Sequence, residues 1–585
     1  MKELQYLNKY FIKYKFQFLL GILITIAAQI FSLFTPQLVK ESIDSTQKFL
    51  EKDNVPAGAI YDMLGENLLL IIATTLIGGV LTFFMRQTLI VMSRHVEFDL
   101  KNEIFRQYEN LTQSFYKQNR TGDLMNRIST DVDRVRQYVG PAIMYSLNTI
   151  VRTVVVITHM IIISPKLTLY TLIPLPLLAW SIFKISREIN KRSTLYQQNL
   201  SKLSSFTQEM FSGIRIIKAY ALEKQKQAAF DELSRDSVKK NMSVAKVNAQ
   251  FGPLMILLIG LSNLVVIYVG GMMYINGRIE LGTIVQFMLY INMLTWPVAS
   301  LGWISSMIQE AESSQKRINE FLKIEPEVKN KTTEHTPILG QIAFNDVTFT
   351  YDDTNITALK NVSFEVNKGE TLAILGRTGS GKSTVLSLIS RLYDAESGTI
   401  TVDGVNIKEA NLYDLRNSIG FVPQDAFLFS DTIQNNIKFG NEDATNDEVI
   451  AVAKKAVVHN NIKNFTNQYE TILGERGITL SGGQKQRVSI ARAMIKDAPI
   501  LLLDDCLSAV DTETEEAILN NLLEFCRDKT TIIVSHRVSS AKNADKIIIL
   551  EDGRIIQQGT HNSLVSQPGY YKELYLKQLS EKELQ

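Results

Sequence analysis

The chain has 585 residues, a formal net charge of +2 and a mean hydropathy of +0.02. This length predicts about two to four domains, and the balanced charge gives no sign of the basic surface that a nucleic-acid partner requires. The two cysteines, Cys506 and Cys526, are too few for a disulfide framework, which indicates a reducing compartment for the second half of the chain.

The first half contains six apolar segments of a length suited to crossing a membrane. A helix needs roughly 20 apolar residues to cross about 30 Å of hydrocarbon. Pro174 and Pro176 fall in the short fourth segment, and Arg86 interrupts the second. No cleavable signal peptide is expected, since the first segment is too long for one. The predicted spans are residues 16–39, 68–92, 140–165, 167–183, 251–277 and 281–307.

Lysine and arginine in the connections predict the orientation of these spans. Both residues are frequent before residue 16 and in the long connections 93–139 and 185–250, whereas connection 40–67 is mainly acidic. Because cytoplasmic loops carry the excess of basic residues, we predict a multi-pass protein of the cytoplasmic membrane. Its N-terminus, its C-terminal half and both long connections are expected to be cytosolic.

The two long connections are charged and rich in helix-favouring residues, so four spans are expected to continue as helices into the cytosol. The pattern breaks once in each, near Gly122 and near Gly213. Each break could be a simple hairpin turn or a short contact helix that transmits force to another domain. Polar residues inside the spans could line a substrate path or hydrogen-bond neighbouring helices; they are Arg86, Arg152, His159, Asn263, Gln286 and Asn292.

The periodicity changes after the polar stretch 325–336. IAFNDVTFTY alternates like an antiparallel strand, VSFEV and TLAIL follow as strands, and TVLSLISRLY is typical of a helix. The segment GRTGSGKST, residues 376–384, fits GxxxxGK[ST] between a strand and a helix. Glycines let backbone N–H groups close on phosphate oxygens, while Lys382 can reach the outer phosphates and Ser383 can ligate Mg²⁺.

A second apolar strand candidate, ILLLDD, ends in two adjacent acids, Asp504 and Asp505. Its uninterrupted apolar run is typical of a buried parallel strand. Side chains of consecutive strand residues point to opposite faces, so the two carboxylates should have separate tasks. We expect Asp504 to hold a hydrated Mg²⁺ and Asp505 to face an attacking water.

Between these motifs lies LSGGQKQR, residues 480–487, directly before a helical run. With it, the chain resembles the ABC transporter family, specifically exporters that fuse one six-helix membrane domain to one nucleotide-binding domain. The resemblance covers nearly the whole chain and rests on an ordered set of motifs: Tyr351, GRTGSGKST, FVPQD with Gln424, GERG at 474–477, LSGGQ, LLLDD, SAVD and SHR with His536.

The resemblance implies a membrane bundle of six helices, as in type I ABC exporters, followed by an α/β P-loop NTPase domain. The expected domains are a transmembrane domain over 1–310, a linker over 311–338 and an ATP-binding domain over 339–585. The implied cofactors are ATP and Mg²⁺. The implied partners are a second half-transporter, membrane lipids and a small amphipathic substrate, with no nucleic acid.

The resemblance also implies a role for each motif residue. Tyr351 would stack on adenine, Gln424 would join the magnesium shell, His536 would contact the γ-phosphate and Asp511 would touch the partner subunit. Tyr351 could instead be a core residue, and GERG with Glu475 could be a surface turn. The ATP-binding loop would be Gly376, Arg377, Thr378, Gly379, Ser380, Gly381, Lys382, Ser383 and Thr384, and the contacts to ATP on the opposite subunit would come from Ser481, Gly482, Gly483 and Gln484.

The chain departs from the family at Asp505, where most members have glutamate. The shorter side chain withdraws the carboxylate by roughly 1 Å, and such a displacement can reduce a rate about 10²-fold. We therefore predict slow hydrolysis with intact ATP binding. Either this chain pairs with a different half-transporter and supplies the weak site, or two copies pair and both sites are slow.

The sequence predicts an ATP-driven exporter half-transporter for lipid, drug-like or other amphipathic compounds. A regulatory or gating membrane subunit with weak hydrolysis is the alternative. Soluble ABC ATPases of DNA repair or translation are disfavoured by the six apolar segments. A protease-linked peptide exporter is disfavoured because no Cys/His peptidase domain precedes the first span.

Overall fold

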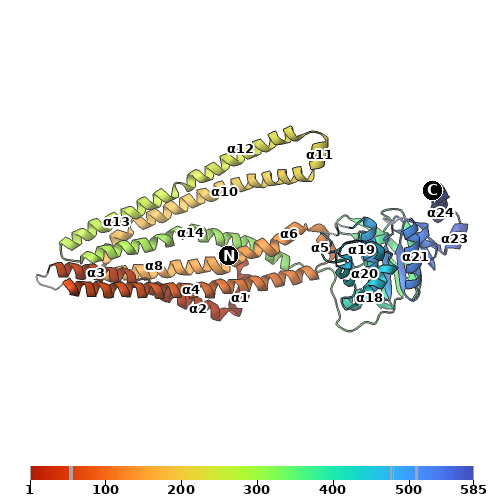
Figure 1. Cartoon of the computed structure of the whole chain (residues 1–585), viewed down its shortest axis with the longest axis horizontal. Helices are drawn as coiled ribbons and strands as arrows, with labels where there is room; N and C mark the ends of the chain where they lie inside the picture. The colour runs from red at the N-terminus through yellow and green to blue at the C-terminus, as the bar shows by residue number, and fades with distance from the viewer. Residues whose placement is uncertain (1, 52–56, 475–476, 478–479, 508–511, 584–585) are drawn as a thin grey trace. The chain divides into compact units, whose positions relative to one another are not determined.

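A computed structural model describes residues 2–51, 57–474, 477, 480–507 and 512–583, which form two compact units (Figure 1). The first unit comprises Met1–Tyr108 and Gly122–Ile324, and the second comprises Glu109–Thr121 and Glu325–Gln585. The short segment 109–121 therefore packs with the C-terminal unit, although helices of the first unit precede and follow it in the chain.

The first unit is a bundle of long helices, as predicted. Helices α10 and α12 run side by side, and α11 joins their ends (Figure 1). Its α-helices are α1 (Asn8–Lys13), α2 (Lys15–Phe31), α3 (Phe34–Leu50), α4 (Ala57–Asn110), α6 (Thr121–Asn126), α7 (Val132–Gln137), α8 (Ile143–Ile163), α9 (Pro165–Leu172), α10 (Pro174–Ser212), α11 (Ile214–Ala219), α12 (Glu223–Asn248), α13 (Phe251–Ile275) and α14 (Leu281–Leu322).

Five helical segments of the described residues are long and apolar enough to cross a membrane: Lys15–Phe49, Tyr61–Asn110, Thr121–Ile163, Glu223–Ile275 and Leu281–Leu322. They contain three of the six predicted spans, 16–39, 68–92 and 281–307, and all but the last two residues of spans 140–165 and 251–277. The predicted span 167–183 is not one continuous helix, because α9 ends at Leu172 and α10 begins at Pro174. Proline lacks the N–H that a continuing helix would need, so the chain breaks at Ile173.

The two long connections, 93–139 and 185–250, are largely helical, with breaks close to the predicted positions. Gly213 separates α10 from α11, and its carbonyl accepts hydrogen bonds from Ile216 and Ile217. In the first connection the break precedes Gly122, which lies inside α6. Here α4 ends at Asn110, and the short helix α5 (Gln113–Gln118) follows an extended Thr112.

Segment 311–338, predicted as a linker, is helical in its first part because α14 continues to Leu322. The extension buries an apolar face that includes Ala311, Ile318 and Phe321. Burial of this kind stabilises helices beyond their intrinsic propensity. The remainder of the segment, up to β1, lacks regular secondary structure.

Three of the polar residues in the predicted spans contact other side chains of the bundle, whereas the buried oxygens Asn263 Oδ1 and Gln286 Oε1 have no hydrogen-bond partner among the described residues. Arg152 Nε donates to Gln29 Oε1 at 2.7 Å, which joins α8 to α2. Gln286 Nε2 donates to the Tyr290 hydroxyl at 3.0 Å, and the ring of His159 packs edge-on against Tyr290. These contacts favour the structural role for Arg152, Gln286 and His159 over the role in a substrate path.

The second unit contains two sheets, which agrees with the predicted α/β domain. A four-stranded antiparallel sheet has the order β2-β1-β4-β5, and a six-stranded sheet has the order β10-β9-β3-β8-β7-β6. The strands are β1 (Ile342–Tyr351), β2 (Ile356–Val366), β3 (Thr371–Gly376), β4 (Ser397–Val402), β5 (Val405–Asn406), β6 (Ile419–Val422), β7 (Ile500–Asp504), β8 (Thr530–Val534), β9 (Lys546–Glu551) and β10 (Arg554–Gly559).

The six-stranded sheet brings the predicted motifs together. Strands β9, β3, β8, β7 and β6 are mutually parallel, so the carboxyl ends of β3, β7, β8 and β6 lie at one edge. The α-helices of the second unit are α5, α15 (Lys382–Ile389), α16 (Leu412–Asn417), α17 (Ile433–Lys438), α18 (Asn446–Lys455), α19 (His459–Lys463), α20 (Gly482–Ile495), α21 (Thr512–Phe525), α22 (Val538–Ala541), α23 (His561–Ser566) and α24 (Tyr570–Glu583).

Candidate functional site

The loop between β3 and α15 has a backbone that only glycine accommodates at two positions. Gly376 and Gly381 have φ values of +153° and +98°. A Cβ atom at Gly376 would lie 2.1 Å from the Leu550 carbonyl oxygen, and one at Gly381 would lie 2.3 Å from that of Ala358. The loop therefore follows the strand closely and turns directly into α15, whose first N–H groups point into it.

Lys382 is the charged centre of this loop. Its side chain is only 6% exposed, and its Nζ donates to the carbonyl oxygens of Gly376 at 3.0 Å and Arg377 at 2.8 Å. Burial lowers the pKa of Lys382, while the charges of Asp505 and Asp504 oppose that change. The buried Ser380 hydroxyl has no hydrogen-bond partner among the described residues.

The loop therefore fits a phosphate-bearing ligand. A buried ammonium group, a helix N-terminus and an unpaired hydroxyl converge on it, and each of them favours an anion. Arg377, Thr378 and Gly379 form its exposed outer part, and Ser380 and Thr384 are buried.

Asp504 and Ser383 form a compact pair beside the loop. The Ser383 hydroxyl donates to Asp504 Oδ1 at 2.9 Å. Burial raises the pKa of Asp504, and the Ser383 hydrogen bond acts against that increase. These oxygen donors suit Mg²⁺, which usually takes few protein ligands and completes its shell with water and phosphate. Among the described residues, no cluster of three or more His, Cys, Asp or Glu side chains could hold a metal by itself.

Asp505 leaves the strand immediately after Asp504. Its φ of +42° lies in the left-handed region, which aspartate tolerates better than most residues. Its N–H donates to the Val534 carbonyl at 2.9 Å, so its backbone is fixed to the end of β8. The change of backbone at β7 explains how two consecutive acids take different directions.

His536 follows the end of β8 and is half-buried. Burial and the positive charge of Lys382 lower its pKa, and the negative charge of Asp505 opposes them. Since the charges of Lys382 and Asp505 both act on His536, the fold brings these three predicted residues into one electrostatic site.

Gln424 lies two residues beyond the end of β6 and is exposed. Because Val422 pairs with Leu503, Gln424 follows its strand at the same sheet edge as Asp504. Its predicted role in the magnesium shell stays a prediction.

The LSGGQ segment begins α20 and carries its N-cap. The Gln484 N–H donates to Ser481 Oγ at 3.3 Å, and the Ser481 N–H donates to Gln484 Oε1 at 2.9 Å. Ser481 and Gly482 are exposed, and Gly483 is half-exposed in the first turn. Within one chain these residues serve the helix, and their exposed N-terminus is free to meet another subunit. Asp511 and Glu475 lie outside the described residues.

Tyr351 ends β1 and packs against the domain core, as in the second of its two predicted roles. Its ring packs edge-on against Phe349 and Tyr393, and its hydroxyl lies 3.0 Å from the Thr384 hydroxyl of the P-loop helix. Lys117 Nζ of α5 lies 4.6 Å from the centre of the Tyr351 ring, at the distance of a cation–π interaction. Tyr351 is thus partly a core residue and partly a residue of the loop site.

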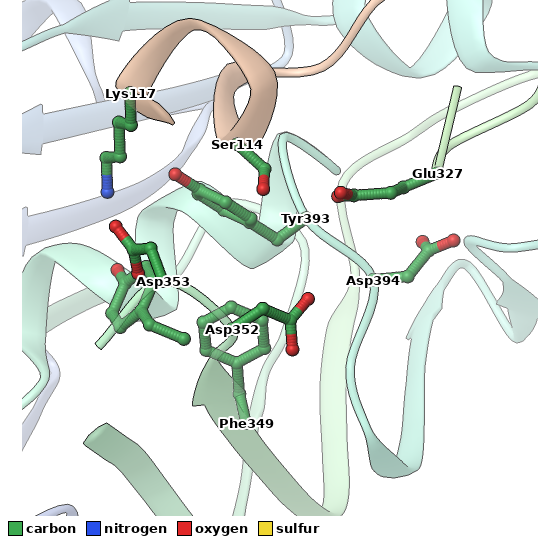
Figure 2. Close-up of a pocket in the computed structure, with 9 residues that line it drawn as sticks. Ser114, Lys117, Glu327, Phe349, Asp352, Asp353, Tyr393 and Asp394 are labelled. Atoms are coloured by element: carbon green, nitrogen blue, oxygen red, sulfur yellow. The ribbon is translucent and has the colours of Figure 1, made fainter. Parts of the chain in front are cut away.

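Sequence reasoning missed Lys117. Only the break after Asn110 signals that α5 leaves the long helices, and nothing local identifies the unit with which it packs. Figure 2 shows Lys117 and Ser114 on this short helix, with the Lys117 side chain directed toward Tyr393. They border a cavity of about 150 Å³ whose other lining residues are Glu327, Phe349, Tyr351, Asp352, Asp353, Tyr393 and Asp394.

Comparison with known proteins gives consistent matches along the chain. A family model described as "ABC transporter transmembrane region" matches residues 16–298, and one described as "ABC transporter" matches residues 359–508. The chain is 38% identical over 513 residues to the multidrug resistance-like ATP-binding protein MdlA of Escherichia coli (strain K12), covering 87% of each chain. It is 32% identical over 552 residues to the ATP-dependent lipid A-core flippase of Syntrophus aciditrophicus (strain SB), covering 93% of this chain and 91% of the flippase.

A solved structure of similar fold is that of a bacterial Atm1-family ABC exporter with ATP bound. The TM-score is 0.78 at 26% sequence identity, and the match covers 96% of this chain and 99% of the exporter. The similarity therefore extends over both units.

Proposed function

Because the chain belongs to the ABC transporter family, we propose that it is an exporter half-transporter that moves amphipathic compounds, drug-like or lipid, outward across the cytoplasmic membrane. The observation that carries this proposal is one chain with membrane-spanning helices and a P-loop site in which Lys382, Asp504, Asp505 and His536 converge. Relatives whose names state multidrug resistance and lipid A-core flipping support this substrate range.

ATP is the proposed energy source. Residues 376–384 would hold its phosphates and Tyr351 its adenine. Ser383, Asp504 and Gln424 would hold Mg²⁺, which supplies neutralising charge at the phosphates when bound. The oxygen-rich Ser383–Asp504 pair is the observation that supports this role.

Asp505 and His536 are the proposed catalytic residues. Asp505 would accept a proton from the attacking water, and His536 would bond to the γ-phosphate. The short Asp505 side chain favours slow turnover. This chemistry resets a transporter whose conformation changes when ATP is bound, so slow hydrolysis limits the cycle without preventing ATP binding.

A second subunit is required by this proposal. ABC half-transporters act as dimers, and the exposed Ser481–Gly482 end of α20 would complete the ATP site of the partner. The N-terminus and the ATP-binding unit would be cytosolic, in agreement with the basic connections. A copy of this chain and a different half-transporter both meet these requirements.

A regulatory membrane subunit is the second candidate function, and Asp505 is the observation that favours it. If hydrolysis is weak, ATP binding alone could gate a partner. ATP-dependent conformational change without net substrate movement would support this alternative.

The deciding experiment reconstitutes the purified chain in proteoliposomes and measures ATP-driven flux of lipid analogues and hydrophobic cations. Lys382→Ala should abolish ATP-dependent flux, because the phosphate-binding ammonium is lost. Lys368→Ala, which changes an exposed lysine of the same unit, is the control and should transport normally. Undiminished flux with Lys382→Ala would refute the proposal.

A further inference from the structure

The backbone around His536 is fixed from both sides of the histidine. The Ser535 N–H donates to the Ile374 carbonyl at 3.2 Å, and the Arg537 N–H donates to the Ser535 hydroxyl at 3.0 Å. The carbonyl of His536 and the N–H of Val538 are two further backbone groups of the turn between β8 and α22.

One side chain of the C-terminal helix satisfies both groups. Gln578 Nε2 donates to the His536 carbonyl at 2.9 Å, and the Val538 N–H donates to Gln578 Oε1 at 2.8 Å. Val538 is 3% exposed, so water does not easily replace this acceptor, and leaving a buried N–H without a partner is unfavourable. The Gln578 amide thus donates one hydrogen bond to the turn and accepts one from it, as a backbone peptide group can.

Helix α24 holds Gln578 on a face whose other side chains are packed into the unit. Tyr571, Leu574, Tyr575 and Gln578 share one face of the helix, because residues at i, i+3, i+4 and i+7 lie on the same side. Tyr571 is fully buried in a cluster that includes Ala373 and Leu375 of β3, and Leu574 and Tyr575 pack against this cluster. The strand that leads into the P-loop therefore also sets the position of α24.

The opposite side of the turn is tied to α21. The buried Glu515 accepts hydrogen bonds from the Arg537 guanidinium and from the Ser539 hydroxyl, the latter at 2.9 Å. These contacts restrain Arg537 and Ser539 but do not bond to the peptide groups next to His536. Gln578 bonds to the His536 carbonyl and the Val538 N–H, and the Ser535 hydroxyl accepts the Arg537 N–H between them. None of these bonds uses the imidazole, which can act toward Lys382 and Asp505.

We propose that Gln578 is a positioning residue for His536, through which the C-terminal helix controls the rate of ATP hydrolysis. The inference rests on the proposed ATPase function and deepens it. Loss of the amide frees the His536 carbonyl, so the peptide is held only through its Arg537 N–H and can tilt. The P-loop is unaffected because the Ser535 bond to β3 persists. The turnover number should fall while ATP binding is retained.

The test measures steady-state ATP hydrolysis of the full chain in lipid. Gln578→Ala and the similarly sized Gln578→Met should lower kcat about tenfold or more, since a displacement of about 1 Å can cost up to 10²-fold. The KM for ATP should stay within about twofold, as expected when an interaction acts in catalysis and not in binding. Gln578→Glu keeps the acceptor for Val538 but loses the donor, so its kcat should lie between those of Gln578→Ala and the wild type.

A second measurement separates positioning from a purely structural effect. In a His536→Ala background, Gln578→Ala should leave the residual single-turnover rate unchanged within about twofold, because residues that act through one another are non-additive. Lys577→Ala, an exposed neighbour on α24, is the matched control. A wild-type kcat in Gln578→Ala, an equal loss of kcat in Lys577→Ala, or an additional loss in the His536→Ala background would overturn the inference.

The ATP hydrolysis measurements also include the wild type and the Lys382→Ala variant. Hydrolysis that survives Lys382→Ala contradicts the proposed function itself. If Lys382→Ala is inactive and the Gln578 variants hydrolyse ATP normally, only the role of Gln578 is refuted.

Discussion

Asp505 shows how a single residue can combine a backbone and a chemical requirement. Its positive φ favours aspartate over longer side chains, whereas the proposed base would benefit from the reach of glutamate. Aspartate at position 505 therefore suits the backbone conformation, at the expense of the reach of the base. The resulting site should bind ATP well and hydrolyse it slowly.

Asp505→Glu should therefore raise kcat for ATP about tenfold or more, because about 1 Å of additional reach restores the position of the base. The same change should lower stability by about 1 kcal/mol, since a glutamate is strained at this φ, which corresponds to a Tm decrease of about 2–4 °C. ATPase assays and thermal melting check both effects. Asp505→Asn should bind ATP with negligible turnover, and an Asp505→Glu variant no faster than the wild type would contradict the assignment of the base.

His536 should make the stability of the protein depend on pH in one direction. Its pKa is lowered in the folded state by burial and by Lys382. At acid pH the unfolded chain therefore binds the proton more readily than the folded chain, and stability rises with pH. The contribution is fully present above the ordinary histidine pKa of about 6.5, and it is lost as the pH falls through the lower folded value.

Thermal melting between about pH 5 and 7.5 should show this loss of stability on the acid side in the wild type. His536→Gln removes the titrating group, so its stability should depend less steeply on pH over the range below about 6.5. Identical pH dependence in the two proteins would show that His536 does not have a lowered pKa.

At the scale of elements, Ser481 at the start of α20 has two proposed roles. Ser481 caps the helix through its reciprocal bonds with Gln484, and it is proposed to contact ATP on the partner. These roles can be separated because aspartate is as good an N-cap as serine, whereas its charge repels phosphate.

Ser481→Ala should lose about 1 kcal/mol of stability together with ATPase activity, because the cap and the phosphate contact both disappear. Ser481→Asp should keep the melting temperature and still lose the activity. Melting curves and ATPase rates of the two variants provide the comparison. An active Ser481→Asp protein would exclude the proposed phosphate contact.

Helix α5 belongs to the ATP-binding unit and lies between long helices of the membrane unit in sequence. Lys117 over Tyr351 is one of its attachments, and a cation–π pair contributes about 0.5–2 kcal/mol. Lys117→Met keeps the apolar stem and loses the charge. We expect it to reduce substrate transported per ATP hydrolysed, measured in proteoliposomes, while Lys117→Arg preserves this ratio. Equal ratios in all three proteins would exclude a coupling role for Lys117.

At the scale of the whole molecule, each proposed ATP site takes its P-loop from one chain and its LSGGQ segment from the other. Two chains that are inactive for different reasons could therefore form one working site together. A Lys382→Ala chain lacks a working P-loop, and a Ser481→Ala chain lacks a working LSGGQ contact, so each alone should be inactive. If two copies pair, a mixture of the two chains forms dimers with one intact site, and ATPase activity should return to a fraction of the wild-type level. Size-exclusion measurements in lipid nanodiscs verify that mixed dimers are present. Mixed dimers without activity would contradict the shared-site arrangement, and failure to pair would indicate a different partner subunit.

The sequence by itself determined the features that contiguous residues encode. The glycine pattern of residues 376–384 requires a phosphate-type loop because only glycine fits the positions of Gly376 and Gly381. The apolar run of β7 is a buried parallel strand, as predicted. The order of the motifs predicted the family, and five of the six apolar segments predicted helices long enough to cross a membrane.

The tertiary structure decided what depends on residues distant in sequence. The extension of α14 to Leu322 and the packing of α5 with the second unit follow from neighbours that no local pattern specifies. Gln578 bonds to His536, 42 positions earlier in the chain, and no pattern in the sequence of α24 predicts this contact. Local periodicity reports how a segment folds, whereas side-chain contacts such as these depend on long-range packing, which exists only once the chain has folded.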